Sequence, residues 1–159
     1  MIDPIEFRRV MGHFASGVTV VTTVREDGEP CGLTASAVCS VSVSPVLVRV
    51  CVEHGADTHG FIVAAGKFAV NVLAEEGGEG LSRRFATFDV EDKFRGVAFR
   101  EEVTGAPVLE GSLAWLDCRV SQAIEAGDHT IFLGEVVAGD AREGTPLVYY
   151  RGGYGRFTP

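Results

Sequence analysis

Runs of β-branched and apolar residues recur along this chain, and turn-forming residues separate them. Residues 17–24 read GVTVVTTV, residues 46–52 read VLVRVCV and residues 67–73 read KFAVNVL. Valine and threonine are stiff at χ1 and fit a pleated strand better than a helix. The chain is therefore predicted to be mainly β, with strands of ordinary length.

Short turns join these runs. Asp27-Gly28 is a hairpin signal after the first run, and Gly127-Asp128 joins residues 113–126 to residues 129–140. The predicted strands are 17–24, 31–44 (interrupted at Pro45), 46–52, 67–73, 113–126, 129–140 and 146–150. Strands in this number, with short connections, indicate a six- to seven-stranded antiparallel β-barrel with a few covering helices.

An N-terminal helix is predicted from a capping pattern. Asp3 can cap the helix, Pro4 suits its first position, and Glu6 completes a D-x-x-E capping box. Apolar residues then recur at helical spacing, so they are expected to face the core. They are Phe7, Val10, Met11 and Phe14.

Two further helices are expected later in the chain. Residues 58–66 read THGFIVAAG and suit a short helix. Residues 74–96 are charged and glycine-rich, lack clear strand character and include a predicted short helix around Leu81 to Phe88. An excursion of this length on a compact β scaffold is typical of a binding lid or a partner contact.

The composition is that of one globular domain spanning residues 1–159. The formal net charge of −8 argues against a nucleic-acid-binding role, because such a protein needs a face that neutralises phosphates. A small anionic ligand is still allowed, since backbone amides can hold one. No apolar run is long enough to span a membrane, and the N-terminus lacks the apolar region of a secretory signal, so the expected location is the cytoplasm.

Cysteine and histidine spacing argues against a metal site. No two cysteines form a C-x-x-C pair, and most are expected to be buried small hydrophobes that a cytoplasmic protein keeps reduced. The cysteines are Cys31, Cys39, Cys51 and Cys118. His54 and His59 are five residues apart, which is not the spacing of a helical metal pair.

Residues 32–45, GLTASAVCSVSVSP, alternate apolar residues with small hydroxyl residues. Small side chains let the backbone approach a flat ligand, and hydroxyls can hydrogen-bond a polar ring edge or a phosphate. The alternative is a serine- and threonine-rich strand exposed to solvent. The predicted hydroxyl face consists of Thr34, Ser36, Ser40, Ser42 and Ser44.

An ordered set of short motifs resembles the flavin reductase-like family, the small reductase components of two-component flavin monooxygenases. Each motif is weakly specific alone, but together they cover nearly the whole chain in the family's order. The motifs are F-x-x-G-V-T-V-V-T-T (14–23), G-L-T-A-S-x-x-x-S-V-S (32–42), P-x-L-V-x-V-C-V (45–52), L-S-x-x-F-A (81–86), F-R-G-V (94–97), G-D-H-T-I-F-L-G-E-V (127–136) and Y-Y-R-G-G-Y-G (149–155).

The resemblance implies a split β-barrel that binds FMN or FAD and forms a homodimer. It implies an NAD(P)H:flavin oxidoreductase, in which a hydride passes from NADH or NADPH to the flavin. Reduced flavin then passes to a separate monooxygenase partner. The family holds the nicotinamide nucleotide without a Rossmann domain, which agrees with the lack of a G-x-G-x-x-G loop between a strand and a helix.

The resemblance also implies roles for individual residues. Those that match positions beside the isoalloxazine ring and its ribityl chain are Thr34, Ala35, Ser36, Cys51, Val52 and Glu53. Thr58 matches a residue near the flavin phosphate. Those that match the segment closing the flavin site are Ser82, Arg83 and Phe85. Arg151 and Tyr154 match the tail that lies over the nucleotide.

One stretch departs from the family pattern. Members commonly carry an Asn and a Ser where residues 53–58 read EHGADT. Asp57 adds a negative charge near the expected phosphate. Backbone amides at Gly55 and Ala56 could form an anion nest there, and a protonated His54 could offset the charge.

His129 opens the predicted strand 129–140 and matches the family's histidine at the nicotinamide side. An imidazole at this place can donate a hydrogen bond to the incoming carboxamide or stabilise developing charge. The plain alternative is a polar residue at a turn. We predict that His129 positions the nicotinamide.

Two other functions stay open from the residues. A relative of pyridoxamine-phosphate oxidase would carry basic residues that grip phosphates, and this chain is acidic. A non-catalytic flavin- or haem-binding carrier or sensor would retain its cofactor and leave NADH unoxidised. The Gly-Asp-His turn and the glycine-rich tail favour the reductase over the carrier.

Overall fold

The computed structural model describes residues 1–87 and 92–158. Its helices are α1 (Pro4–Met11), α2 (Asp57–Ala65) and α3 (Glu75–Ala86). Its strands are β1 (Ser16–Gly17), β2 (Thr19–Val24), β3 (Pro30–Ala35), β4 (Val38–Val43), β5 (Val46–Glu53), β6 (Lys67–Val72), β7 (Phe99–Glu101), β8 (Pro107–Leu109), β9 (Ala114–Ala126), β10 (His129–Ala141), β11 (Leu147–Tyr150) and β12 (Gly153–Arg156). Within the described residues, none of the helices combines the length and the apolar character needed to cross a membrane.

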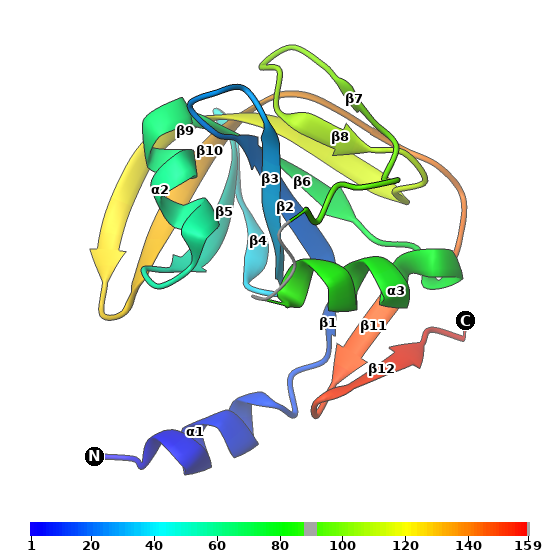
Figure 1. Ribbon diagram of the computed structural model, residues 1–159. Coiled ribbons are helices and arrows are strands. Elements are labelled where there is room, and N and C mark those ends of the chain that lie inside the picture. The colour runs from blue at the N-terminus through cyan, green and yellow to red at the C-terminus, as the bar shows by residue number, and fades with distance from the viewer. Residues whose placement is uncertain (88–91, 159) are drawn as a thin grey trace.

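A seven-stranded antiparallel sheet, counted over the described residues, forms the barrel (Figure 1). Its strand order is β3-β2-β6-β9-β10-β5-β4. The longest pairing is the β9–β10 hairpin, which runs from the Ala126–His129 pair to the Ala114–Ala141 pair. Strands β3 and β5 also approach each other without being neighbours in the ladder, so the sheet curls round on itself. The predicted antiparallel split β-barrel is confirmed.

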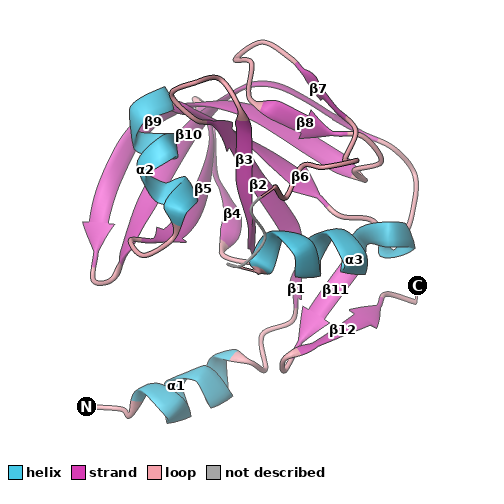
Figure 2. Cartoon of the chain, in the orientation of Figure 1, coloured by secondary structure: helices cyan, strands magenta, loops and turns pink. Residues whose placement is uncertain are grey.

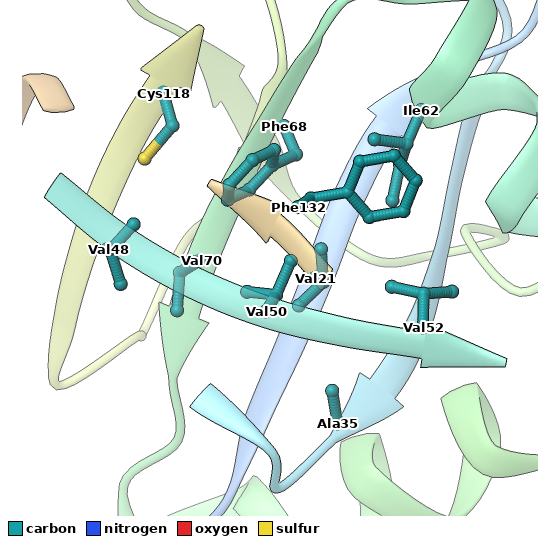
Figure 3. Close-up of a cluster of buried hydrophobic side chains, with 10 residues drawn as sticks. All are labelled: Val21, Ala35, Val48, Val50, Val52, Ile62, Phe68, Val70, Cys118 and Phe132. Carbon is teal, nitrogen blue, oxygen red and sulfur yellow. The ribbon is translucent and has the colours of Figure 1, made fainter. Parts of the chain in front are cut away.

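The barrel core is filled by side chains from facing strands and from α2 (Figure 3). Phe68 of β6, Phe132 of β10 and Ile62 of α2 are fully buried beside valines of β2 and β5. Each such side chain contributes about 1.5–3 kcal/mol by leaving water. Gly134 permits the close packing, because a Cβ there would lie 2.5 Å from the Cζ atom of Phe68.

Helix α1 stands apart from the barrel, whereas α2 and α3 lie against it (Figure 2). Asp3 caps α1 as predicted, since the Ile5 amide donates to its carboxylate at 2.8 Å, but Glu6 pairs with Arg9 instead of closing a capping box. The prediction that the apolar residues of this segment face the core is wrong. These residues are 48–75% exposed, and they are Phe7, Val10, Met11 and Phe14.

The strand predicted at 31–44 is two strands. A break separates β3 from β4, and a register shift falls between Ser40 and Ser42. The hydroxyl residues therefore do not share one continuous face. Thr34 and Ser36 line the cavity described below, whereas the hydroxyl residues of β4 do not.

Short elements escaped the sequence prediction. Strands β7 and β8 pair with each other, and β12 joins β11 and β1 in a small sheet. Such short runs cannot display a strand period. Helix α3 begins at Glu75, well before the predicted Leu81, and it bends at Gly77, which has a φ of 72°. The predicted helix end at Phe88 lies outside the described residues.

The cysteines divide into two groups. Cys31 and Cys118 are buried as predicted, and burial raises the pKa of their thiols to about 11 and about 12. Cys39 is exposed and Cys51 is half-buried, so the prediction of burial fails for these two. Among residues 1–87 and 92–158, no group of three or more His, Cys, Asp or Glu side chains is placed to hold a metal ion.

Candidate functional site

A cavity of about 570 Å³ opens where β3, β5, α2, α3 and the start of β10 meet. Cofactor and drug-sized ligand sites have volumes of about 300–1,000 Å³. Segments far apart in the sequence form its lining, so the barrel itself creates the site. Its volume is suitable for a nucleotide-sized ligand.

One wall of the cavity consists of small residues. Gly32, Thr34 and Ala35 come from β3, and Ser36 and Ala37 follow between β3 and β4. The Thr34 hydroxyl donates to the carbonyl of Ser82 at 2.6 Å, so it is engaged with α3. Leu33 is the one larger side chain of this stretch in the lining, and the small residues on either side of it can accept a flat ring against the backbone.

The start of α2 forms a second side, where Ala56, Asp57 and Thr58 line the cavity. Ala56 caps the helix without a side-chain hydrogen bond, so the first amides lack a capping oxygen. A helix start carries positive partial charge and suits an anionic group. The anion nest expected from the amides of Gly55 and Ala56 does not form as predicted, because the Ala56 amide already donates to the carbonyl of Glu53 at 3.1 Å.

Two cations also reach the cavity, Arg25 and Lys93, and neither was predicted from the sequence. The Lys93 ammonium donates to the carbonyl of Phe85 at 3.1 Å, and partial burial lowers the pKa of that ammonium group. The Arg25 guanidinium lies 5.8 Å from the ring centroid of Phe61. The signal that could have identified Lys93 is its place directly before the F-R-G-V motif.

His129 lines the cavity from the first position of β10, opposite Glu53 of β5. Its Nδ1 atom lies 2.7 Å from the carboxylate of Asp128, and this hydrogen bond lowers the pKa of the Asp128 carboxyl. An ionised carboxylate only accepts, so Nδ1 carries the proton. Nε2 then accepts a hydrogen bond in the neutral imidazole and donates one in the imidazolium.

The cavity brings together most of the residues predicted for cofactor binding. Those in its lining are Thr34, Ala35, Ser36, Cys51, Glu53, Thr58, Phe85 and His129. Those outside its lining are Val52, Ser82, Arg83, Arg151 and Tyr154. Val52 is fully buried in the core, because Cys51 and Glu53 take the cavity face and side chains alternate along a strand.

Ser82, Arg83 and Tyr154 form a layer behind the small-residue wall. The hydroxyls of Ser82 and Tyr154 are 2.8 Å apart, and the Arg83 guanidinium lies 5.0 Å from the Tyr154 ring centroid. Since the Ser82 carbonyl accepts from Thr34, these residues hold α3 against the wall. Arg151 is exposed, and its amide donates to the carbonyl of Gly12, so it contacts the segment after α1 instead.

A split antiparallel barrel with a flat-walled, partly cationic cavity is the architecture of a small cofactor-binding barrel protein. The model of the flavin reductase like domain matches residues 11–158. The chain belongs to this family.

Its relatives include reductases that match almost the whole chain. The flavin reductase (NADH) of Kitasatospora aureofaciens is 45% identical over 161 residues, which cover 99% of this chain and 83% of that protein. The reductase component of the 4-nitrophenol 4-monooxygenase/4-nitrocatechol 2-monooxygenase of Rhodococcus opacus is 46% identical over 158 residues, with coverage of 99% and 83%. The NADH:FAD oxidoreductase of Streptomyces globisporus, solved with NAD and FAD fragments, matches with a TM-score of 0.89 at 40% identity, covering 100% of this chain and 97% of that one.

The residues of the cavity fit a flavin. The isoalloxazine ring is flat with polar edges, which suits the small-residue wall between Gly32 and Ala37. The flavin phosphate is anionic, which suits the start of α2 and the cations Arg25 and Lys93, and these offset the carboxylates of Asp57 and Asp92 in the same lining. The chain can therefore hold both parts of the group within one cavity.

Proposed function

We propose that this protein is an NAD(P)H-dependent flavin reductase, which transfers a hydride from NADH or NADPH to FMN or FAD. One observation carries the proposal: a single cavity combines a flat wall of small residues, cationic side chains and His129. The names of the relatives from K. aureofaciens and S. globisporus support the same activity, and they favour NADH as the donor.

The chain supplies orientation and electrostatics. When bound, the flavin provides the redox chemistry by accepting the hydride. The wall from Thr34 to Ala37 receives the ring, and Cys51 and Glu53 border it from β5. The start of α2 with Thr58, together with Lys93, receives the phosphate.

His129 positions the nicotinamide in this proposal. Hydride transfer needs the two reacting rings stacked at about 3–3.5 Å, so alignment accounts for much of the rate. Asp128 fixes the imidazole through Nδ1, which leaves Nε2 for the carboxamide. His129 thus orients the nicotinamide, which donates the hydride, and the cavity wall orients the flavin ring, which accepts it.

We also propose a separate monooxygenase as the consumer of reduced flavin, in line with the R. opacus relative, which is a monooxygenase reductase component. The chain acts as one domain, 1–159, and pairs as a homodimer. The exposed apolar residues of α1 and the exposed valines of the β4–β5 hairpin, Val41, Val43 and Val46, support a second copy as the partner.

The test is oxidation of NADH and of NADPH, followed by loss of nicotinamide absorbance, with FMN, FAD or riboflavin added. We expect flavin-dependent turnover that falls about tenfold or more in His129→Ala, because the donor loses its alignment. His13→Ala is the matched control, since His13 is exposed and lies outside the cavity lining.

If His129→Ala turns over as fast as His13→Ala, His129 does not position the nicotinamide and is only a polar residue at a turn. A wild-type protein that keeps flavin through purification and oxidises neither nucleotide would instead be a flavin carrier, and the reductase proposal would fail.

A further inference from the structure

Four polar side chains from separate parts of the fold meet around one buried hydroxyl. Thr130 of β10 is 1% exposed. Its Oγ1 atom lies 3.2 Å from Nε2 of His54, 2.8 Å from Nε2 of His59 and 3.0 Å from Oε1 of Glu125. We call these four residues the Thr130 cluster. None of them belongs to the cavity lining, so the proposed function leaves the cluster unexplained.

The protons of the Thr130 cluster follow from hydrogen-bond chemistry. A threonine hydroxyl has one proton and two lone pairs, and an ionised carboxylate only accepts. Thr130 therefore donates to Glu125 and accepts from both histidines through their Nε2–H groups. The Nε2 atom of His54 also lies 3.0 Å from Oε2 of Glu125, so its proton has a second acceptor. The arrangement defines one tautomer for each imidazole.

The Thr130 cluster connects the start of β10 to the segment that follows β5, two parts that the β5–β10 ladder does not pair with each other. The β5–β10 ladder ends at the pair between Glu53 and His129. His54 and His59 lie at the two ends of the segment that follows, and this segment lines the cavity with Thr58 among other residues. Thr130 comes directly after His129 in β10. One hydroxyl thus fastens both ends of a cavity wall to the strand that carries His129.

Other contacts join the same two parts of the fold. The His54 amide donates to the carbonyl of Asp128 at 3.0 Å, which secures the first end of the segment. At the second end, the His59 ring packs against Phe132 with centroids 5.4 Å apart. Ile62 of α2 also lies in the barrel core with Phe132, and the hydrogen bond from His59 to Thr130 adds a polar link between α2 and β10.

We propose that Thr130 is a positioning residue for flavin reduction, which acts through His54 and His59 to hold the phosphate-side wall in register with His129. The inference rests on the proposed function, since it assigns flavin to that wall and nicotinamide to His129. Thr130 touches neither reactant. Its loss changes the relative placement of the two, and a misplacement of about 1 Å costs up to about a hundredfold in rate.

The test compares Thr130→Val, which keeps the shape and removes the hydroxyl, with Thr130→Ser, which restores it. We expect Thr130→Val to raise the flavin Kd and to lower the rate of hydride transfer at saturating flavin and NADH by about tenfold. Thr130→Ser should return both quantities towards those of the wild type. Thr23→Val is the matched control, because the Thr23 hydroxyl is equally buried and donates to the carbonyl of Lys67 outside the cavity.

A second readout needs no turnover. Nitrogen-15 NMR of the histidines in the flavin-free protein should show Nε2-protonated tautomers for His54 and His59. Thr130→Val should remove this preference at His59, whereas His54 keeps Glu125 as its acceptor. If Thr130→Val does not fold, His54→Ala serves instead, because that side chain is 39% exposed. It should raise the flavin Kd and leave the melting temperature nearly unchanged.

The outcomes separate the two proposals. A wild type without flavin-dependent NADH oxidation contradicts the proposed function itself. A wild type that turns over, with Thr130→Val no different in rate and Kd from Thr23→Val, overturns the positioning role and leaves Thr130 as a structural hydroxyl.

Discussion

Lys93 combines partial burial with a place in the lining of the cavity that we propose binds the flavin phosphate. Burial disfavours the charged ammonium, so the pKa of Lys93 in the folded protein lies below its ordinary value of 10.5. Between these two pKa values the unfolded chain binds more protons than the folded one. The free energy of unfolding therefore rises with pH in that window, while the charge available to a phosphate falls.

We expect the flavin Kd of the wild type to rise as pH increases towards 10.5, because Lys93 loses its proton earlier than an exposed lysine. Lys93→Met should weaken binding near neutral pH by about tenfold, equivalent to about 1.4 kcal/mol, and should flatten the alkaline dependence. Lys93→Arg should bind flavin with little pH dependence, since arginine stays charged. Quenching of flavin fluorescence measures all three. An unchanged Kd in Lys93→Met would place the phosphate elsewhere.

For single residues, sequence motifs predicted those site residues that are neighbours along the chain. Thr34 to Ser36 line one wall together because they are consecutive, and His129 was recognised within its own motif. Arg25, Phe61 and Lys93 were missed because the fold alone brings their segments together. Val52 was predicted to bind the cofactor, but it is buried in the core. Because side chains alternate along a strand, Val52 could have been excluded once Cys51 and Glu53 were assigned to the cavity.

Helices and strands could be predicted from the sequence where they are long enough to show a periodic pattern of apolar residues. The β9 and β10 runs were predicted almost to their ends, whereas β7, β8 and β12 are too short for a pattern. The helical spacing before Phe14 correctly indicated α1, but a spacing cannot say what covers the apolar face. Burial depends on where the helix lies relative to the barrel, which is a property of the tertiary structure.

A substitution at the junction between β3 and β4 can test the cavity wall without changing the packed core. Ala37 is exposed and lines the cavity, so Ala37→Leu adds bulk where the flat ring is proposed to lie. We expect a rise of about tenfold or more in the flavin Kd, because overpacking of this size costs about 1–3 kcal/mol. The melting temperature should change little, since the side chain enters the cavity and not the packed interior.

Ser40→Leu is the matched control for this wall, because Ser40 is exposed on β4 and lies outside the lining. It should leave the flavin Kd unchanged in the same titration. If both leucine variants bind flavin as the wild type does, the ring does not lie against the segment between β3 and β4.

At the scale of the whole molecule, acidic residues outnumber basic ones, and the cavity lining shares this excess. The net charge of −8 would repel a phosphate, and the cavity lining carries three carboxylates, Glu53, Asp57 and Asp92, beside the two cations Arg25 and Lys93. Binding of the phosphate as proposed therefore depends on the placement of the cations and of the start of α2 within the cavity, whereas net charge excludes only extended polyanions such as nucleic acid. This is why composition could dismiss one class of partner but could not locate the site.

The apolar surface outside the barrel is the remaining property of the whole molecule, and it leads to a prediction about assembly. Phe7, Val10 and Phe14 are 52%, 48% and 75% exposed, and no residue of α1 is buried within one chain. An apolar helix face of this kind is stable in water when a partner covers it. Because the proposed partner is a second copy, light scattering should give about twice the chain mass of 16.9 kDa.

Val10→Lys should shift the protein towards the single-chain mass, because a charge enters the proposed interface while a lysine in the last turn of α1 remains favourable for the helix. Val103→Lys is the matched control, since Val103 is 58% exposed in the loop between β7 and β8 and should leave the mass unchanged. Near-ultraviolet circular dichroism should show an intact barrel in both variants. A wild type of single-chain mass, or a Val10→Lys protein that stays paired, would mean that α1 does not hold two copies together.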